Sequence, residues 1–227
     1  MDSALRQSEK KPLVSLVVPV YKVEPYLDKA LQSIEKQDFK DFEVIIVNDG
    51  SPDNCQQIID RFVHKNPYFT CILQENKGLG EARNTGIRRA KGKYIMFMDS
   101  DDFIASNFIS RMYETITSAD ADIACCECTY FFSPSGTKYN LPFGHNTVLS
   151  REDALKRLMR DISVHHFAWN KIYKLSLFIE NQIFYPSILF EDIATTSRLF
   201  LHCKKIAFIR EHLYFYVQRS GSIMSNI

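Results

Sequence analysis

The chain is 227 residues long, which allows one large domain or two small ones with a sizeable buried core. Hydrophobic residues make up 45% of it and charged residues 24%, as is ordinary for a soluble globular protein. Its 28 basic and 27 acidic residues leave a formal net charge of +1. The overall charge therefore excludes a general electrostatic attraction to nucleic acid or to an anionic membrane, so any phosphate must be bound locally.

The chain has no apolar run that approaches the roughly 20 residues of a membrane-spanning helix. Its first eleven residues are polar and lack the apolar core of a signal peptide. We therefore expect a cytoplasmic protein whose residues 1–12 are disordered. Peripheral association with the inner face of the plasma membrane, through a partner or a further segment, is compatible with this pattern.

The six cysteines do not form a framework of the kind found in secreted proteins, and a cytoplasmic location favours reduced thiols. Cys125 and Cys128 have the spacing of a redox or zinc half-site, but no second pair follows at zinc spacing. Both fall in residues 122–132, which resemble a strand. Buried strand thiols are therefore the favoured interpretation.

Apolar strands alternate with amphipathic helices over the first half of the chain. The first strand is a continuous apolar, β-branched run, which is typical of a strand buried on both faces of a parallel sheet. The alternation predicts a parallel sheet with helices on both faces. Strands are expected at 13–20, 42–47, 68–73 and 93–98, and helices at 24–37, 54–64, 79–90 and 107–117.

The pattern is less regular in the second half. Residues 122–132 predict a strand, with 137–143 beside it. Ser150 and Asp153 resemble a capping box that opens a helix to about residue 160. A helix is expected at 191–202 and short strands at 205–209 and 212–217. We expect one compact α/β unit, because no linker or repeat separates the two halves.

Three of the four loops that follow the first strands are polar. Ligands of parallel α/β sheets bind outside the carboxyl ends of the strands, so these loops are expected to line one site. A single acidic loop would be ambiguous with a turn or a helix cap, but three loops at one edge make that interpretation less favourable. They are Asn48-Asp49-Gly50-Ser51, Asn76-Lys77-Gly78-Leu79-Gly80 and Asp99-Ser100-Asp101-Asp102.

The acidic loop Asp99-Ser100-Asp101-Asp102 is the candidate metal site. Carboxylates this close repel one another unless a cation lies between them. Hard oxygen ligands suit Mg²⁺ or Mn²⁺, and magnesium needs only one or two protein carboxylates when substrate phosphates complete its shell. The alternative is a hydrated cap for the helix expected at 107–117.

The loop at 76–80 has two glycines and a lysine, but it matches neither a P-loop nor a dinucleotide-binding fingerprint. Its glycines would let the backbone approach a ligand closely. Lys77 and Arg83 are candidates to contact phosphate, although the loop taken alone favours a solvated basic turn.

The motifs together resemble those of glycosyltransferase family 2, the inverting enzymes of the GT-A fold. The resemblance runs from Val14 to Ser222, and the combination is specific although no single motif is. The motifs are VPVY at 18–21, VNDGS at 47–51, NKGLGEARNTG at 76–86, MDSDD at 98–102, AWNK at 168–171, FED at 190–192 and QRSGS at 218–222.

This resemblance implies a GT-A, or Rossmann-like, α/β fold. A predominantly parallel sheet should be flanked by helices, with a smaller mixed C-terminal region on the acceptor side. Residues 13–227 would form a single domain, with a nucleotide-binding half at 13–118 and an acceptor-binding half at 119–227.

The resemblance also assigns roles to individual residues. Asp101 is expected to be the main ligand of Mn²⁺ or Mg²⁺, with Asp99 and Asp102 in support. Asp192 matches the general base, Glu191 its neighbour, and Trp169 borders the acceptor pocket. Tyr21 should stack on the base and Asp49 accept a hydrogen bond from it. The expected donor-binding residues are Pro19, Val20, Tyr21, Glu24, Asp49, Lys77, Gly78, Arg83, Asp99, Ser100, Arg219 and Ser222.

The implied activity is inverting, metal-dependent transfer of a sugar from a nucleoside diphosphate sugar, with UDP favoured, to a hydroxyl of a glycan or lipid-linked acceptor. A role in bacterial polysaccharide synthesis and a homo-oligomeric state are further family-level expectations. From the residues alone, the favoured interpretation of Glu191-Asp192 is a helix N-terminus whose carboxylates complement the dipole.

Two other classes compete with this interpretation. A non-catalytic nucleotide-sugar-binding or scaffold protein of the same fold would not need Asp101 and Asp192, which are both present. A nucleotidyltransferase would need a glycine-rich basic loop directly after the first strand. Tyr21-Lys22-Val23 stands there instead.

Overall fold

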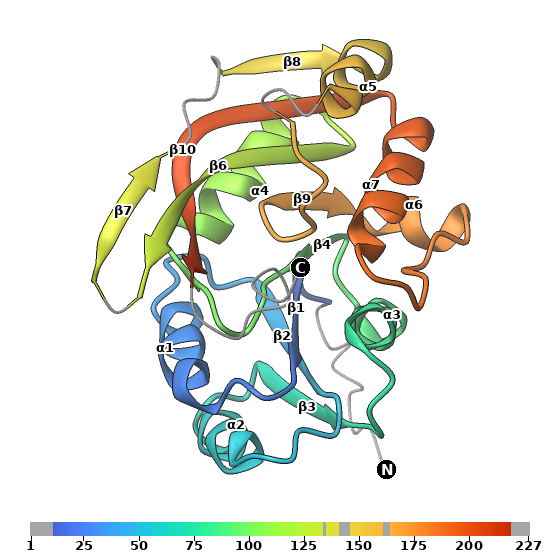
Figure 1. Ribbon diagram of the computed structural model, residues 1–227. Helices are drawn as coiled ribbons and strands as arrows, with labels where there is room; N and C mark the ends of the chain where they lie inside the picture. The colour runs from blue at the N-terminus through green and yellow to red at the C-terminus, as the bar shows by residue number, and fades with distance from the viewer. Residues whose placement is uncertain (1–10, 134, 141–145, 161–163, 219–227) are drawn as a thin grey trace, which may run out of the picture.

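The computed structural model describes residues 11–133, 135–140, 146–160 and 164–218, and a single mixed sheet forms its centre (Figure 1). The strands are β1 Val14–Val20, β2 Phe42–Asn48, β3 Phe69–Leu73, β4 Tyr94–Phe97, β5 Phe103–Ile104, β6 Ile123–Phe132, β7 Thr137–Asn140, β8 Thr147–Ser150, β9 Lys171–Lys174 and β10 Lys205–Gln218. The helices are α1 Glu24–Glu35, α2 Cys55–Lys65, α3 Leu79–Arg89, α4 Phe108–Ser118, α5 Arg151–Met159, α6 Leu175–Glu180 and α7 Glu191–His202.

The first four strands form the parallel sheet that the alternation predicts. Their order is β3-β2-β1-β4, and all three pairings are parallel. Every residue of β1 is buried, because helices cover both of its faces. This arrangement brings the loops after β1, β2, β3 and β4 to one edge of the sheet.

The sheet continues as β4-β9-β6-β10-β5, with β7 added to β6 and β8 to β10. β9 runs antiparallel to both β4 and β6, whereas β6 and β10 are parallel. Among the described residues, every antiparallel pairing includes a strand from β5 onward. The expected α/β fold with a mostly parallel central sheet and a mixed C-terminal region is therefore confirmed.

The C-terminal strands differ in detail from the prediction. β10 is one long strand where two short ones were expected, and its pairing with β6 changes register on either side of His212. The polar run Arg210-Glu211-His212 interrupts the apolar pattern at this irregularity. The sequence therefore wrongly predicted two strands in place of β10. Three further strands, β5, β8 and β9, were not predicted because they are only two to four residues long.

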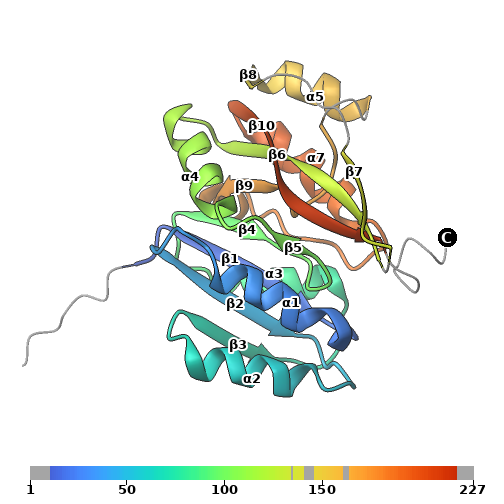
Figure 2. The ribbon, with the colours of Figure 1, turned by 90° about the vertical axis from the view of Figure 1, so that its left-hand side faces the viewer.

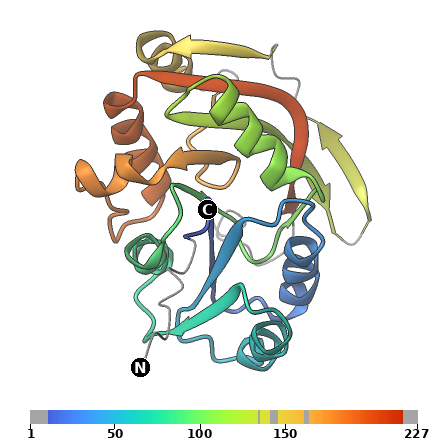
Figure 3. The same cartoon turned by 180° about the vertical axis from the view of Figure 1, so that it is seen from behind.

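The sheet divides the apolar core into two layers, and helices cover each layer. Buried residues of α1, α2 and α4 pack on one face, and those of α3, α5, α6 and α7 pack on the other (Figures 2 and 3). Gly86 lets α3 lie directly on β1, because a Cβ there would come within 2.2 Å of the Val17 side chain. No helix in the described part of the chain is long and apolar enough to cross a membrane.

Two smaller expectations are confirmed. Ser150 caps α5, since its hydroxyl accepts the backbone N–H of Asp153 at 3.2 Å. Cys125, Cys126 and Cys128 lie on β6 and are buried. Burial raises the pKa of Cys125 to about 11 and that of Cys128 to about 12, so these thiols stay protonated at neutral pH.

Candidate active site

Asp49 lies directly after β2 and connects two of the predicted loops by hydrogen bonds. Its Oδ1 accepts the backbone N–H of Lys77 at 2.9 Å and its Oδ2 accepts that of Gly78 at 2.8 Å. The side-chain amide of Gln74 donates to the same carboxylate at 2.7 Å. Gly78 has a φ of 87°, a conformation that favours glycine. Asp49 therefore fixes the turn that leads into α3.

The predicted donor residues near the end of β1 occupy two environments. Pro19 and Val20 are buried in the strand, whereas Tyr21 directly after it is 41% exposed. Glu24 opens α1, and its carboxylate accepts the backbone and side-chain N–H groups of Asn54 at 3.1 and 2.9 Å. Glu24 thus joins the loop after β1 to the residue that precedes α2. Tyr21 in the same loop keeps its ring accessible to solvent.

Arg83 on α3 connects the acidic loop to α7. Its guanidinium is buried, and Nη2 donates to Asp99 Oδ1 at 2.8 Å while Nη1 donates to Glu191 Oε1. Burial lowers the pKa of Arg83, but the charges of Asp99 and Glu191 more than offset this and raise it above its ordinary value. Arg83 was expected near the nucleotide, and its guanidinium forms ion pairs with these two carboxylates.

The acidic loop is held from β10. Ser100 and Asp102 are buried, and the carboxylate of Asp102 accepts the hydroxyl of Tyr214 and the backbone N–H of Val217, each at 2.7 Å. The backbone N–H of Asp99 donates to the Tyr214 hydroxyl at 3.1 Å. Burial raises the pKa of Asp102 well above its usual range, and the neighbouring charges of Asp101 and Asp99 add to this.

The acidic loop supplies the hard oxygen ligands that Mg²⁺ or Mn²⁺ prefers. Within the described residues, however, no three His, Cys, Asp or Glu side chains form a ready cation site. Asp102 is buried against β10, whereas Asp99 and Asp101 are half-buried and are the more accessible carboxylates of the loop. One or two carboxylates fit a cation whose shell is completed by phosphate oxygens, so the chemistry of the donor set agrees with such an ion.

The pair Glu191-Asp192 stands in the first turn of α7, as the sequence predicts. The preceding Phe190 has a left-handed backbone with a φ of 59°, which is strained for this residue type. Burial raises the pKa of Asp192, and the charge of Asp99 adds to this, while Arg83 opposes it. Because Asp99 affects Asp192 in this way, the α7 carboxylates and the acidic loop belong to one electrostatic environment.

Trp169 is enclosed in an aromatic stack and is only 4% exposed. Its ring lies 4.5 Å from that of Phe167 and 4.3 Å from that of Tyr214, between centroids. The Trp169 ring is therefore packed in the core and does not form an open wall of a pocket.

Lys171 holds the segment that carries this stack. Its ammonium group is fully buried and donates to the carbonyls of Phe167 at 2.6 Å and His165 at 2.8 Å and to Asn170 Oδ1 at 2.7 Å. Burial lowers its pKa. Lys171 was expected only as part of the AWNK motif, and Tyr214 only as a core aromatic residue.

Two predicted donor-binding residues, Arg219 and Ser222, lie outside the described residues. Among the other predicted residues, hydrogen bonds or ion pairs connect Asp49 with Lys77 and Gly78, and Arg83 with Asp99 and Glu191. Glu24 is bonded instead to Asn54, which was not predicted.

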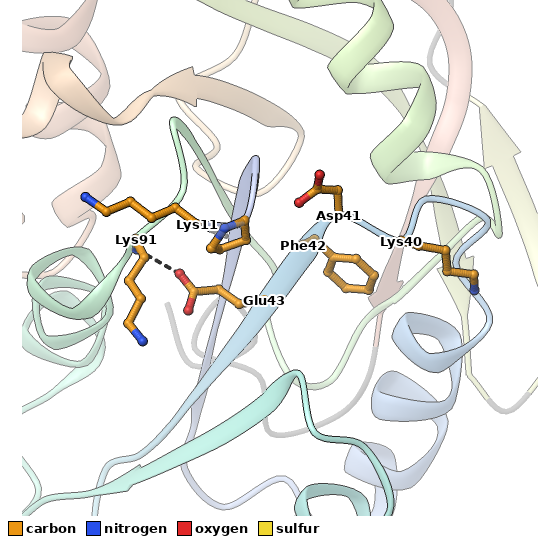
Figure 4. Close-up of a pocket in the computed structure, with 7 residues that line it drawn as sticks. Lys11, Lys40, Asp41, Phe42, Glu43 and Lys91 are labelled. Carbon is orange, nitrogen blue, oxygen red and sulfur yellow. Dashed lines mark hydrogen bonds between the residues drawn. The ribbon is translucent and has the colours of Figure 1, made fainter. Parts of the chain in front are cut away.

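A cavity of about 500 Å³ lies at the amino ends of β1 and β2, away from these groups (Figure 4). Glu43 is engaged there by the backbone N–H of Lys91 and the hydroxyl of Ser15, both at 2.7 Å. This cavity contains no residue of the predicted site; its lining is Lys11, Pro12, Lys40, Asp41, Phe42, Glu43 and Lys91.

Comparison with known proteins gives consistent matches. The chain is 36% identical over 220 residues to the glycosyltransferase GlyG of Streptococcus pneumoniae serotype 4, covering 93% of this chain and 73% of GlyG. Among solved structures, Staphylococcus aureus TarS 1–349 in complex with UDP-GlcNAc superposes with a TM-score of 0.80 at 24% identity, over 94% of this chain and 61% of that one.

A mannosyltransferase from Pyrobaculum calidifontis, PcManGT, in complex with GDP-Man and Mn²⁺, superposes with a TM-score of 0.67 at 18% identity, over 94% of this chain and 59% of that one. These two structures share the fold with this chain. The family model described as glycosyl transferase family 2 matches residues 15–180. The chain therefore belongs to glycosyl transferase family 2.

Proposed function

We propose that this protein is an inverting, metal-assisted glycosyltransferase that moves a sugar from a UDP-sugar to a hydroxyl of a glycan or lipid-linked acceptor. Glycosyl transfer itself follows from the family. The UDP-sugar, the metal, the inverting course and the acceptor class are the proposal.

The observation that carries the proposal is the contact of Arg83 with both Asp99 and Glu191. It draws the first turn of α7 against the acidic loop, although Arg83 and Glu191 are 108 residues apart. Asp192, a carboxylate that could take a proton, would thus be held beside the acidic loop, which would meet the donor diphosphate. Transfer needs these two functions next to each other.

Asp192 is the proposed general base. The acceptor hydroxyl must lose its proton as it attacks the anomeric carbon, and one positioned carboxylate can accept that proton. Burial raises the pKa of Asp192, which makes the carboxylate a stronger base than an exposed one. Attack from the face opposite the diphosphate inverts the anomeric carbon. Glu191, paired with Arg83, supports the position of Asp192.

Asp101 and Asp99 are the proposed ligands of Mn²⁺ or Mg²⁺. When bound, the cation neutralises the charge that develops on the departing diphosphate, so no general acid is required. The Mn²⁺ in the complex of PcManGT is compatible with this role. Lys77 and Gly78, set by Asp49, would meet the donor from the neighbouring loop.

UDP is the preferred nucleotide because TarS, which has the higher TM-score of the two structures, is in complex with UDP-GlcNAc. The exposed ring of Tyr21 would stack on the base. Tyr21 would therefore hold the nucleotide at the end of β1.

The test is Asp192→Asn, with Asp60→Asn as a matched control. Asp60 is an exposed aspartate on α2, away from the predicted site. Asp192→Asn should abolish sugar transfer and leave UDP affinity by calorimetry nearly unchanged, whereas Asp60→Asn should retain both. Full transfer by Asp192→Asn would refute the base. Tight UDP-sugar binding by the wild type without transfer or hydrolysis would favour the non-catalytic binding protein.

A further inference from the structure

Tyr214 lies between the acidic loop and the aromatic stack. The side chain is fully buried on β10. Its hydroxyl donates to Asp102 at 2.7 Å and accepts the backbone N–H of Asp99 at 3.1 Å, while its ring stacks on Trp169 at 4.3 Å between centroids. One hydroxyl group thus bonds the first and the last residue of the loop.

Asp102 is committed to β10 through both carboxylate oxygens. Oδ2 accepts the Tyr214 hydroxyl, Oδ1 accepts the backbone N–H of Val217 at 2.7 Å, and the residue is only 1% exposed. A Mg²⁺ ion would have to lie about 2.1 Å from a ligand oxygen while keeping phosphate and water in its shell. A carboxylate enclosed by protein donors is poorly suited to that, even though each oxygen has a second lone pair.

The pairing of β5 with β10 adds a backbone constraint to the same region. Ile104 is the register partner of Tyr214, and the backbone N–H of Ala105 donates to the carbonyl of Leu213 at 2.9 Å. The chain that leaves the acidic loop is therefore fixed to the strand that carries the hydroxyl.

We propose that Tyr214 is a positioning residue for the acidic loop and that Asp102 is its anchor on β10 rather than a metal ligand. By fixing the loop at Asp99 and Asp102, the hydroxyl sets the position from which Asp101 meets a cation bound to a diphosphate. This division of roles rests on the proposed function, because it concerns the same site.

The experiment is calorimetric titration of Mn²⁺ into the protein saturated with UDP, which reports binding without turnover. Asp101→Asn should lose Mn²⁺ binding. Tyr214→Phe keeps the ring stack but removes the hydroxyl, and it should weaken Mn²⁺ binding about tenfold, as expected when a group that orients a ligand is lost. Asp102→Asn should weaken it by a similar factor. The double variant should be no more than about twofold weaker than either single variant, because both changes break the same bond.

Tyr173→Phe is the matched control. Tyr173 is also fully buried, and its hydroxyl donates to the carbonyl of Ala168 at 3.4 Å, away from the acidic loop. Tyr173→Phe should bind Mn²⁺ like the wild type even where its thermal unfolding midpoint falls as far as that of Tyr214→Phe. Equal weakening in both variants would mean a general loss of structure and would overturn the proposal.

The remaining outcomes separate this inference from the proposed function. Loss of Mn²⁺ binding in Asp102→Asn as complete as in Asp101→Asn would make Asp102 a ligand and overturn the inference alone. Wild-type affinity in Tyr214→Phe would do the same. If the wild type itself bound no Mn²⁺ in the presence of UDP, the metal-assisted function would fall, and this inference with it.

Discussion

Arg83 and Glu191 form a buried ion pair between α3 and the first turn of α7, and the same guanidinium holds Asp99 at 2.8 Å. The contact joins α3, in the first half of the chain, to the helix that carries Asp192. The buried guanidinium of Arg83 serves both carboxylates, so the loss of this single cation would leave two negative charges without compensation.

Arg83→Met should therefore destabilise the protein strongly. Breaking a buried ion pair by removing one partner typically costs about 3–5 kcal/mol. The measurement is urea unfolding, read as the free energy of unfolding. Arg88→Met is the control on the same helix, because Arg88 pairs with Glu81 at the surface with its side chain 51% exposed. That change should cost under about 1 kcal/mol. Equal losses in the two variants would contradict the buried role of Arg83.

The sequence predicted what depends on local pattern. The apolar run of β1 and the helical spacing of Leu27, Ala30, Leu31 and Ile34 identified the parallel half, because buried faces repeat with the period of the element. The polar loops could be assigned to one edge because parallel strands end at the same side. That edge is where Asp49 binds the backbone of Lys77 and Gly78.

Contacts between distant segments could not be predicted in the same way. The bond between Tyr214 and Asp102 spans 112 residues and depends on the bent course of β10, which no local pattern encodes. Tyr214 therefore resembled any other core aromatic residue. Lys171 was missed for a related reason, since three carbonyl oxygens surround its charge and no acidic residue in the sequence indicates them.

Asp49→Ala should loosen the turn before α3. The backbone N–H groups of Lys77 and Gly78 would lose their acceptor, so their hydrogen exchange should accelerate. We also expect UDP affinity to fall about tenfold, which corresponds to roughly 1.4 kcal/mol. Glu75→Ala, an exposed change in the same loop, should alter neither quantity. Unchanged exchange in Asp49→Ala would show that the turn holds without the carboxylate.

Lys171→Met should destabilise the segment that carries Trp169. The methionine keeps similar length but leaves the carbonyls of Phe167 and His165 and the Asn170 side chain without their buried donor. We expect a loss of about 2–4 kcal/mol in the free energy of unfolding, measured in urea, since unsatisfied buried acceptors are costly. Lys156→Met is the control, because that side chain is 70% exposed. A neutral effect of Lys171→Met would indicate that the segment is held by the aromatic stack alone.

The pH dependence of transfer should report the protonation of Asp192. Burial raises the pKa of this carboxyl, and Asp99 raises it further, while the positive charges of Arg83 and Lys171 lower it. A general base must be ionised, so kcat/KM should fall as pH decreases through the raised pKa, above the usual aspartate value of about 3.9. Lys171→Met removes a charge that favours the ionised form and should move this acid limb to higher pH. Lys156→Met removes an exposed charge that does not act on Asp192, so it should leave the acid limb in place. An acid limb that did not move, in a Lys171→Met protein shown to be folded, would mean that Asp192 does not set the limb.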